Sequence, residues 1–298
     1  MTYASGTHPA STTARSTFAT TLTSAGFTRV TQDYVPAATY LLDVWKSPAA
    51  SNAAGTDWYL FLLEQVSGST RFISMTVAEG WDDSTKLATK YIPVSNNVAP
   101  AADYSVGNTG IAPTAANLYY MSMGSWTDTS GTSYKITATV DRVIAAFVAN
   151  SPTSHIYAGH ADRFVPVLYE PVQPLVCLRL GDTSTHNQTN DTAQGGGTRE
   201  PGVTTSSLNN WRVALGNSSN DNLYAILTEN ISGTVILSPL VPKAVRSSPP
   251  YRCILKGVRG TGSTGASTDV ATETLADGST ITYWNANAAS TQRFIPQV

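Results

Sequence analysis

The chain has 298 residues, of which 41% are hydrophobic and 13% are charged, and its formal net charge is −2. The charged fraction is low against the roughly 25% typical of globular proteins, and about a quarter of the residues are Ser or Thr. This composition excludes disorder driven by charge and low hydrophobicity. The near-zero charge excludes the basic surface of a general nucleic-acid binder, so we expect no direct nucleic-acid binding.

The opening residues, MTYASGTHPASTTARS, contain no apolar run after a basic start, and we expect no secretory signal peptide. No stretch approaches ~18 consecutive apolar residues, which predicts no membrane span. Cys177 and Cys253 each lie in an apolar run, PLVCLRL and YRCILKG. We expect two buried free thiols, because a reducing cytoplasm does not favour the alternative, a disulfide between them.

A helix is expected over 11–25. Ser11 or Thr12 can cap its start, and Gly26 is suited to end it. Apolar residues recur between them at helical spacing: Phe18, Leu22 and Ala25.

The period then changes to one typical of strands. Aromatic and aliphatic runs predict a three-stranded meander at 40–47, 57–66 and 70–78. The stretch 79–116 has little periodicity and contains several prolines, so we expect a long surface excursion there. Asp141-Arg142 can form a tight hairpin turn, although neither residue is the Gly or Asn that such turns favour. Strands that would belong to a second sheet are expected at 118–126, 134–150 and 155–161.

The stretch 182–209 has low complexity and no core-forming residue before Val203. It is either a disordered linker or a long loop that becomes ordered only when it contacts a neighbour. Short apolar runs separated by polar turns come after it at 211–216, 222–229, 233–241, 252–260, 279–287 and 293–298. We therefore predict a mainly β fold, sandwich-like or barrel-like, with an N-terminal helix and long loops. The chain divides into a helix-plus-β region 1–181, the Gly/Thr-rich loop or linker 182–209, and a β-rich region 210–298 that could form one compact unit with the first.

Residues with metal-ligating chemistry are present but poorly placed. A strand would put His155 and His160 on opposite faces, which does not suit joint ligation of a metal. Asp82-Asp83 lack the alternating oxygen ligands of a calcium loop and are interpreted as a solvated turn, in which Asp83 or Ser84 caps the next segment of the chain.

The glycines at 195–197 lack the following Lys-Ser/Thr of a phosphate-binding loop, and no hydrolase, metalloprotease or dinucleotide-binding motif occurs. We therefore expect no catalytic, cofactor-binding or metal-binding residues, no cofactor and no enzymatic activity.

Aromatic residues are the other notable feature. Most lie in expected strands, where packing in the core or between subunits is favoured, and a surface cluster would instead support glycan binding. They are Trp58, Trp81, Trp126, Trp211, Trp284, Tyr119, Tyr120 and Tyr157.

The order of segments resembles a family of structural proteins of tailed-bacteriophage virions, found in the tail tip, baseplate or neck. The similar segments are FATTLTSAGFTRV, YLLDVWKSP followed by DWYLFLLEQ, YKITATVDRVIAAFVANSPTSHIYAGHADRF, and the closing RCILKGVRG and ETLADGSTITYWNANAASTQRFIPQV. The resemblance implies a non-enzymatic β-rich subunit of a multimeric ring. It supplies no catalytic residues.

From this resemblance we expect a protein made in the host cytoplasm and located in the virion, whose partners are other copies of itself and other virion proteins. The alternatives are a receptor- or glycan-binding adhesin or capsid decoration module, with a host-surface glycan as ligand, and a tail-associated hydrolase, which needs two facing carboxylates roughly 5–10 Å apart. We also expect 182–209 and part of 79–116 to lie against neighbouring subunits, because neither has enough apolar residues to offset its ordering entropy alone.

Overall fold

The computed structural model is mainly β, as the sequence predicts, with a single α-helix among the residues that it describes. Strands predominate because the apolar runs after the helix have the length and aromatic content of strands. The described residues are 1–10, 12–66, 70–91, 110–115, 117–118, 120–127, 129–147, 155–163, 175–179, 197–199, 211–213, 238–240, 242–244, 253–261, 270–284 and 293–296.

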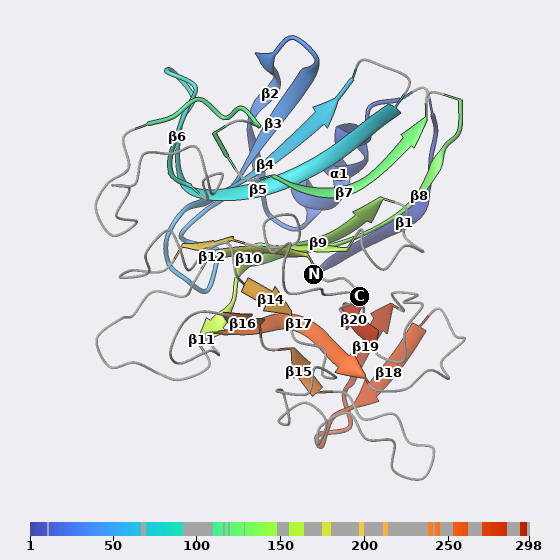
Figure 1. Ribbon diagram of the computed structural model, residues 1–298. Coiled ribbons are helices and arrows are strands. Elements are labelled where there is room, and N and C mark those ends of the chain that lie inside the picture. The colour runs from blue at the N-terminus through green and yellow to red at the C-terminus, as the bar shows by residue number, and fades with distance from the viewer. Residues whose placement is uncertain are drawn as a thin grey trace.

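The first sheet is antiparallel and has the order β2-β3-β4-β5-β6, with β7 also paired to β5. It forms the upper half of the molecule in Figure 1 and curls toward a half-barrel. Its strands are β2 (Thr28–Ala37), β3 (Tyr40–Ser47), β4 (Trp58–Gln65), β5 (Thr70–Asp82), β6 (Leu87–Tyr91) and β7 (Met121–Thr127).

The second sheet is also antiparallel and has the order β1-β8-β9-β10-β12-β13. A two-residue turn joins its central hairpin, in which Thr139 pairs with Arg142. Its strands are β1 (Thr2–His8), β8 (Thr132–Thr139), β9 (Arg142–Phe147), β10 (Ile156–His160), β12 (Leu175–Arg179) and β13 (Gly197–Arg199).

The main core lies between the two sheets, and helix α1 (Ala14–Ser24) lies against it (Figure 1). The side chains of Phe18 and Leu22, on the apolar face of the helix, are buried in this core. Phe147 of β9 is central to this core. Its ring stacks on Phe18 with centroids 5.6 Å apart and on Trp126 of β7 at 5.8 Å. One aromatic side chain thus joins the helix to both sheets.

The first sheet is buried on its other face as well. A second cluster forms there, where the sheet curls toward β6 and the segment around Leu118. Burial on both faces explains why β3 and β4 are nearly continuous apolar runs without the alternation of a half-exposed strand. The cluster comprises Leu42, Val44, Phe61, Leu63, Ala78, Ala88, Tyr91 and Leu118.

C-terminal strands cover the outer face of the second sheet (Figure 1). Trp284 of β19 is buried there, and its indole N–H donates to Thr137 Oγ1 of β8 at 3.0 Å. Asp162 of β11 pairs with Ile254 of β17, which joins the chain's two halves in one small sheet. The strands of this layer are β11 (Asp162–Arg163), β14 (Trp211–Val213), β15 (Ser238–Leu240), β16 (Pro242–Ala244), β17 (Cys253–Thr261), β18 (Val270–Thr274), β19 (Thr280–Trp284) and β20 (Arg293–Pro296).

Several sequence expectations need correction. The sequence pattern predicts neither strand β1 nor strand β2, since both are rich in Thr and polar residues. The expected surface excursion 79–116 is wrong over 79–91, where β5 continues to Asp82 and turns into β6. Its remainder at 92–109 lies outside the described residues, as do 222–229 and most of 233–241. Of 182–209, the structure describes only 197–199, which pair with β12 of the same chain.

The close approach of β7 to β9 gives a first prediction. Gly124 has φ 153°, and a Cβ built there would lie 1.7 Å from the carbonyl oxygen of Phe147. We expect Gly124→Ala to lower the free energy of unfolding by about 3 kcal/mol or more, because the two sheets would have to separate. The matched control is Gly55→Ala, whose Cβ meets nothing within 4 Å and which should lose only ~1–2 kcal/mol through its left-handed backbone. Equal losses in urea unfolding would show that the sheets are not in tight contact there.

Candidate functional site

The most concentrated polar cluster of the described residues lies at the start of α1. The sequence predicts a cap from Ser11 or Thr12, but the N-cap residue is Thr13 and its side chain makes no capping hydrogen bond. The Thr12 hydroxyl instead donates to the carbonyl of Pro9. Residue 11 lies outside the described residues. The predicted cap therefore does not form at Thr12, and another group must accept the free N–H groups of the first turn.

Glu64 of β4 supplies that group. Its Oε1 accepts the backbone N–H of Ala14 at 2.9 Å, and its Oε2 accepts that of Arg15 at 3.3 Å. The carboxylate thus caps the helix from a strand fifty residues away, where the positive end of the helix dipole also favours a negative charge. Glu64 occupies an inward position of β4, in line with Leu60 and Leu62, so it faces the core between the sheets.

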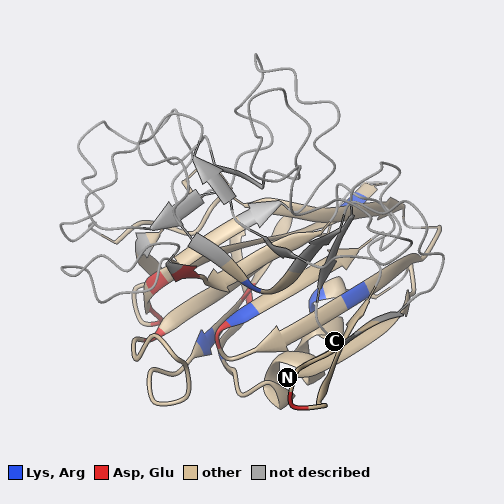
Figure 2. Cartoon of the chain, turned by 90° about the horizontal axis from the view of Figure 1, so that it is seen from below, with Lys and Arg blue, Asp and Glu red and all other residues tan. Residues whose placement is uncertain are grey.

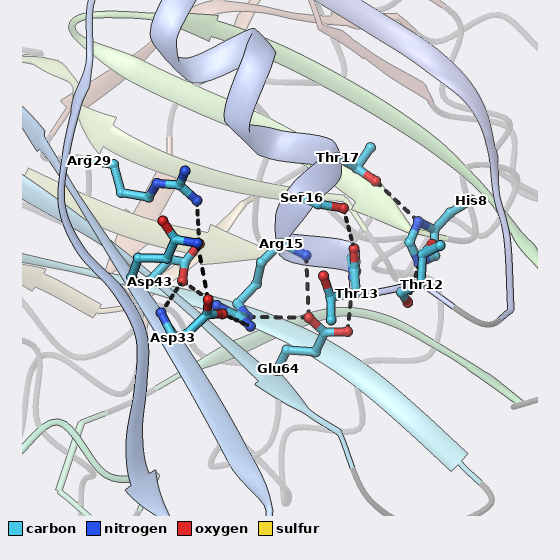
Figure 3. A network of polar contacts seen from close by, with 12 residues as sticks. His8, Thr12, Thr13, Arg15, Ser16, Thr17, Arg29, Asp33, Asp43 and Glu64 are labelled. Carbon is cyan, nitrogen blue, oxygen red and sulfur yellow. Dashed lines mark hydrogen bonds and ion pairs between the residues drawn. The ribbon is translucent and has the colours of Figure 1, made fainter.

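Arg15 extends this contact into a network of five charged side chains, which we call the Arg15 network: Arg15, Arg29, Asp33, Asp43 and Glu64. The Arg15 guanidinium forms ion pairs with Asp43, with Asp33 at 2.8 Å and with Glu64 at 3.3 Å (Figure 3). Arg29 adds a contact of 3.5 Å to Asp43. Arg15, Asp43 and Glu64 are buried, whereas Asp33 is exposed.

The electrostatics of the network depend on this burial. Desolvation raises the pKa of Glu64 despite the opposing N–H groups and the nearby Arg15. The hydrogen bond from Arg15 lowers the pKa of the exposed Asp33. Two guanidinium groups and the helix N-terminus oppose three carboxylates, so the charges of the network as a whole are nearly balanced. The carboxylates already accept hydrogen bonds and ion pairs from the Arg15 guanidinium and the backbone N–H groups, so none of them is a free general base. The cluster instead holds the start of α1 against the first sheet, and we call this contact the helix clamp.

His8 fixes the other side of the helix start. Its Nε2 lies 3.1 Å from the carbonyl oxygen of Thr12, so this nitrogen carries the proton and donates. The Thr17 hydroxyl then donates to Nδ1 at 3.1 Å (Figure 3). Burial lowers the pKa of His8, in keeping with a neutral imidazole packed edge-on against Trp126. The ring joins the end of β1 to α1.

The two histidines singled out from the sequence lie on opposite faces of the second sheet. The His160 ring packs against Trp58 in the main core, with centroids 6.0 Å apart. The His155 ring lies 5.1 Å from that of Trp284, in the C-terminal layer. Both histidines are buried. The structure therefore does not bring them together in one site.

Asp82 and Asp83 lie at the exposed turn between β5 and β6, as expected for a solvated turn. The residue that organises the turn is Asp82, whereas the sequence favours Asp83 or Ser84. Its carboxylate accepts the backbone N–H groups and the hydroxyls of Ser84 and Thr85. These hydrogen bonds, led by the Ser84 hydroxyl, lower the pKa of Asp82 to about 2.

The aromatic residues mostly serve packing. Trp58, Trp126, Trp284 and Tyr157 are buried, while Trp81 and Tyr120 are half-buried beside the second cluster. The side chain of Trp211, and Tyr119 as a whole, lie outside what the structure describes.

Cys177 is a buried free thiol, as predicted, and burial raises its pKa. The side chain of Cys253 is not described, and of the glycines at 195–197 only Gly197 is, in β13.

Outside the Arg15 network, the charged residues are few and lie scattered along the described strands (Figure 2). Over the same residues, no group of three or more His, Cys, Asp or Glu side chains is arranged to hold a metal ion. Within the described ranges, no helix combines the length and apolar character needed to cross a bilayer. A scan with protein-family models finds no match for the chain, and a search among curated proteins finds no similar sequence.

The helix clamp gives a second prediction. Glu64→Gln should lower the free energy of unfolding by about 2–3 kcal/mol, because the buried N–H groups of Ala14 and Arg15 lose a charged acceptor and an amide N–H₂ turns toward donors. The control is Lys46→Gln, which removes the half-exposed ion pair between Lys46 and Asp57 and should cost at most ~1 kcal/mol. Chemical denaturation of both variants measures the difference. Equal costs would mean that Glu64 does not hold the helix.

The turn at Asp82 gives a third prediction. The double variant Ser84→Ala/Thr85→Ala should raise the pKa of Asp82 from about 2 toward the ordinary carboxyl value, because it removes both hydroxyl donors. Since the pKa is depressed in the folded state, the stability that Asp82 contributes is present above about pH 4 and is lost as the pH falls toward 2. Carboxyl-carbon NMR titration measures the shift. Asp277, whose pKa a separate Ser279 turn lowers, should not change. An unaltered Asp82 titration would contradict the turn geometry.

Proposed function

We propose that the chain is a non-enzymatic structural subunit of a tailed-bacteriophage particle, in the tail, baseplate or neck, which assembles with other copies into a multimeric ring. The placement in a phage particle is supported by the resemblance in segment order. The structural role is supported by one observation on the fold. Buried polar groups in the described residues join segments that are distant in the sequence.

The Arg15 network is the main case, because it connects α1 with β2, β3 and β4. A second case lies at the turn of the β8–β9 hairpin. The carbonyl of Val140 accepts hydrogen bonds from the Ser47 hydroxyl and from the Trp58 indole N–H, the latter at 3.0 Å. At the exposed side of the same turn, the Asp141 carboxylate accepts the N–H of Ala53 at 2.7 Å. These contacts tie the first sheet to the second and give a rigid body suited to carrying interfaces.

The burial of four of the six tryptophans favours this function over the glycan-binding alternative. Trp45, Trp58, Trp126 and Trp284 are each at most 4% exposed, so none offers a ring face on which a sugar could stack. Their area instead stabilises the core, at about 25 cal/mol per Å² removed from water.

Particle mass tests the proposal. Light scattering of the purified chain should give a mass several times the 31.5 kDa of one copy, and negative-stain images should show closed particles with rotational symmetry, as expected for most homo-oligomers. A 31.5 kDa species at every concentration, in the presence and absence of host cell-surface extract, would contradict a self-assembling subunit.

A further inference from the structure

Strand β1 presents a regular sheet edge. All seven of its residues, Thr2–His8, pair in register with β8 without a bulge. Among the described residues β8 is its one neighbour, so β1 forms an edge of the second sheet. The odd-numbered residues point away from the core, and Tyr3 is 39% exposed.

The hairpin next to β1 determines which backbone groups face outward. A two-residue hairpin closes on a hydrogen-bonded pair, here Thr139 and Arg142, so Thr139 directs its N–H and C=O toward β9. Successive residues of a strand alternate in direction, so Ala138 directs its groups toward Thr2 of β1. The same alternation along β1 leaves the N–H and C=O groups of Tyr3, Ser5 and Thr7 directed away from β8.

Native edge strands are usually protected from further pairing by charged side chains, proline or bulges. Strand β2 of the first sheet has all three. It carries exposed Arg29 and Asp33, contains Pro36, and shifts register three times against β3. Strand β1, with the sequence TYASGTH, has no Lys, Arg, Asp, Glu or Pro and no bulge. Among the residues that the structure describes, nothing pairs with this outer edge, which is therefore available to another strand.

We propose that β1 pairs antiparallel with β1 of a second copy of this chain, about a two-fold axis at Ser5. This inference rests on the proposed function as a self-assembling subunit. The register is the one in which every outward-directed residue meets another, with Tyr3 opposite Thr7 of the second copy and Ser5 opposite Ser5. It forms about six backbone hydrogen bonds, two for each such pair.

A second copy fits this edge for two reasons. The uncharged strand places no like charges opposite each other when it meets itself, and Tyr3 opposite Thr7 is an aromatic–β-branched pair of the kind that stabilises sheets. An isologous contact of this kind joins subunits in twos. Closing a ring requires a different surface, so the β1 contact and the ring can be tested separately.

Opposite charges at Ser5 provide the test. Ser5→Lys places two lysines directly across the axis and should weaken the β1 contact at least about tenfold, and Ser5→Glu should do the same. An equimolar mixture of the two variants should restore the association, because Lys then meets Glu. The control is Val35→Lys, an exposed position of the bulged strand β2, which should leave association unchanged. Sedimentation velocity at low salt measures all four samples, and unchanged thermal unfolding verifies that the variants fold.

The outcomes separate the two proposals. Full association of Ser5→Lys, or a mixture that stays dissociated, overturns the β1 contact and leaves the oligomeric subunit standing. Pairs that depend on Ser5 without any larger assembly support the β1 contact and contradict the ring. A wild-type chain that is monomeric at every concentration overturns both.

Discussion

The fold depends on how the N–H groups at the start of helix α1 are capped. The first turn of α1 is buried between two sheets, and its N–H groups need acceptors that its own capping residue does not supply. Glu64 provides them from β4, and its burial is made tolerable by Arg15, which in turn binds Asp43 and Asp33. Helix capping and charge neutralisation are therefore one interaction. Removing Arg15 would leave the Glu64 carboxylate buried without its ion-pair partner in the network.

This arrangement positions the rest of the core. With its N-terminus held against β4, α1 directs Phe18 onto Phe147 of β9, and Phe147 in turn packs on Trp126 of β7. The central strands β9 and β10 of the second sheet are then buried on both faces, between the main core and the C-terminal layer that Trp284 anchors to Thr137. Such a body has few ways to deform, because its layers are connected by both packing and buried hydrogen bonds. Rigidity of this kind supports the proposed role as a structural subunit.

The sequence predicts the parts of the fold that depend on apolar pattern. Helix α1 and strands β3, β4, β8 and β9 are recognisable because their aromatic and aliphatic residues are spaced for burial. Strands β1 and β2 are not recognisable in this way. Their backbone groups pair with β8 and β3, but their side chains are largely polar and exposed, so long-range pairing decides their structure.

The Arg15 network could not be predicted from the sequence, for a related reason. Charged residues are expected at the surface, and the contacts of Glu64 with the start of α1 span about fifty positions of sequence. The sequence does contain an indication: Asp43 and Glu64 interrupt the apolar runs YLLDVWKS and DWYLFLLEQV at core-facing positions, Asp43 in line with Trp45 and Glu64 in line with Leu62. A charge at a core position of a strand requires a partner. The identity of that partner becomes visible only when the helix is placed.

The most direct test of the helix clamp is amide hydrogen exchange at Ala14 and Arg15. First-turn amides of a helix have no intrahelical acceptor and ordinarily exchange through local fraying. If Glu64 caps the buried helix, these two amides should be protected to nearly the same free energy as the central amides of β4, such as those of Phe61 and Leu62. Exchange at the rate of a freely fraying helix end, with β4 still protected, would contradict the clamp on which this description of the fold depends.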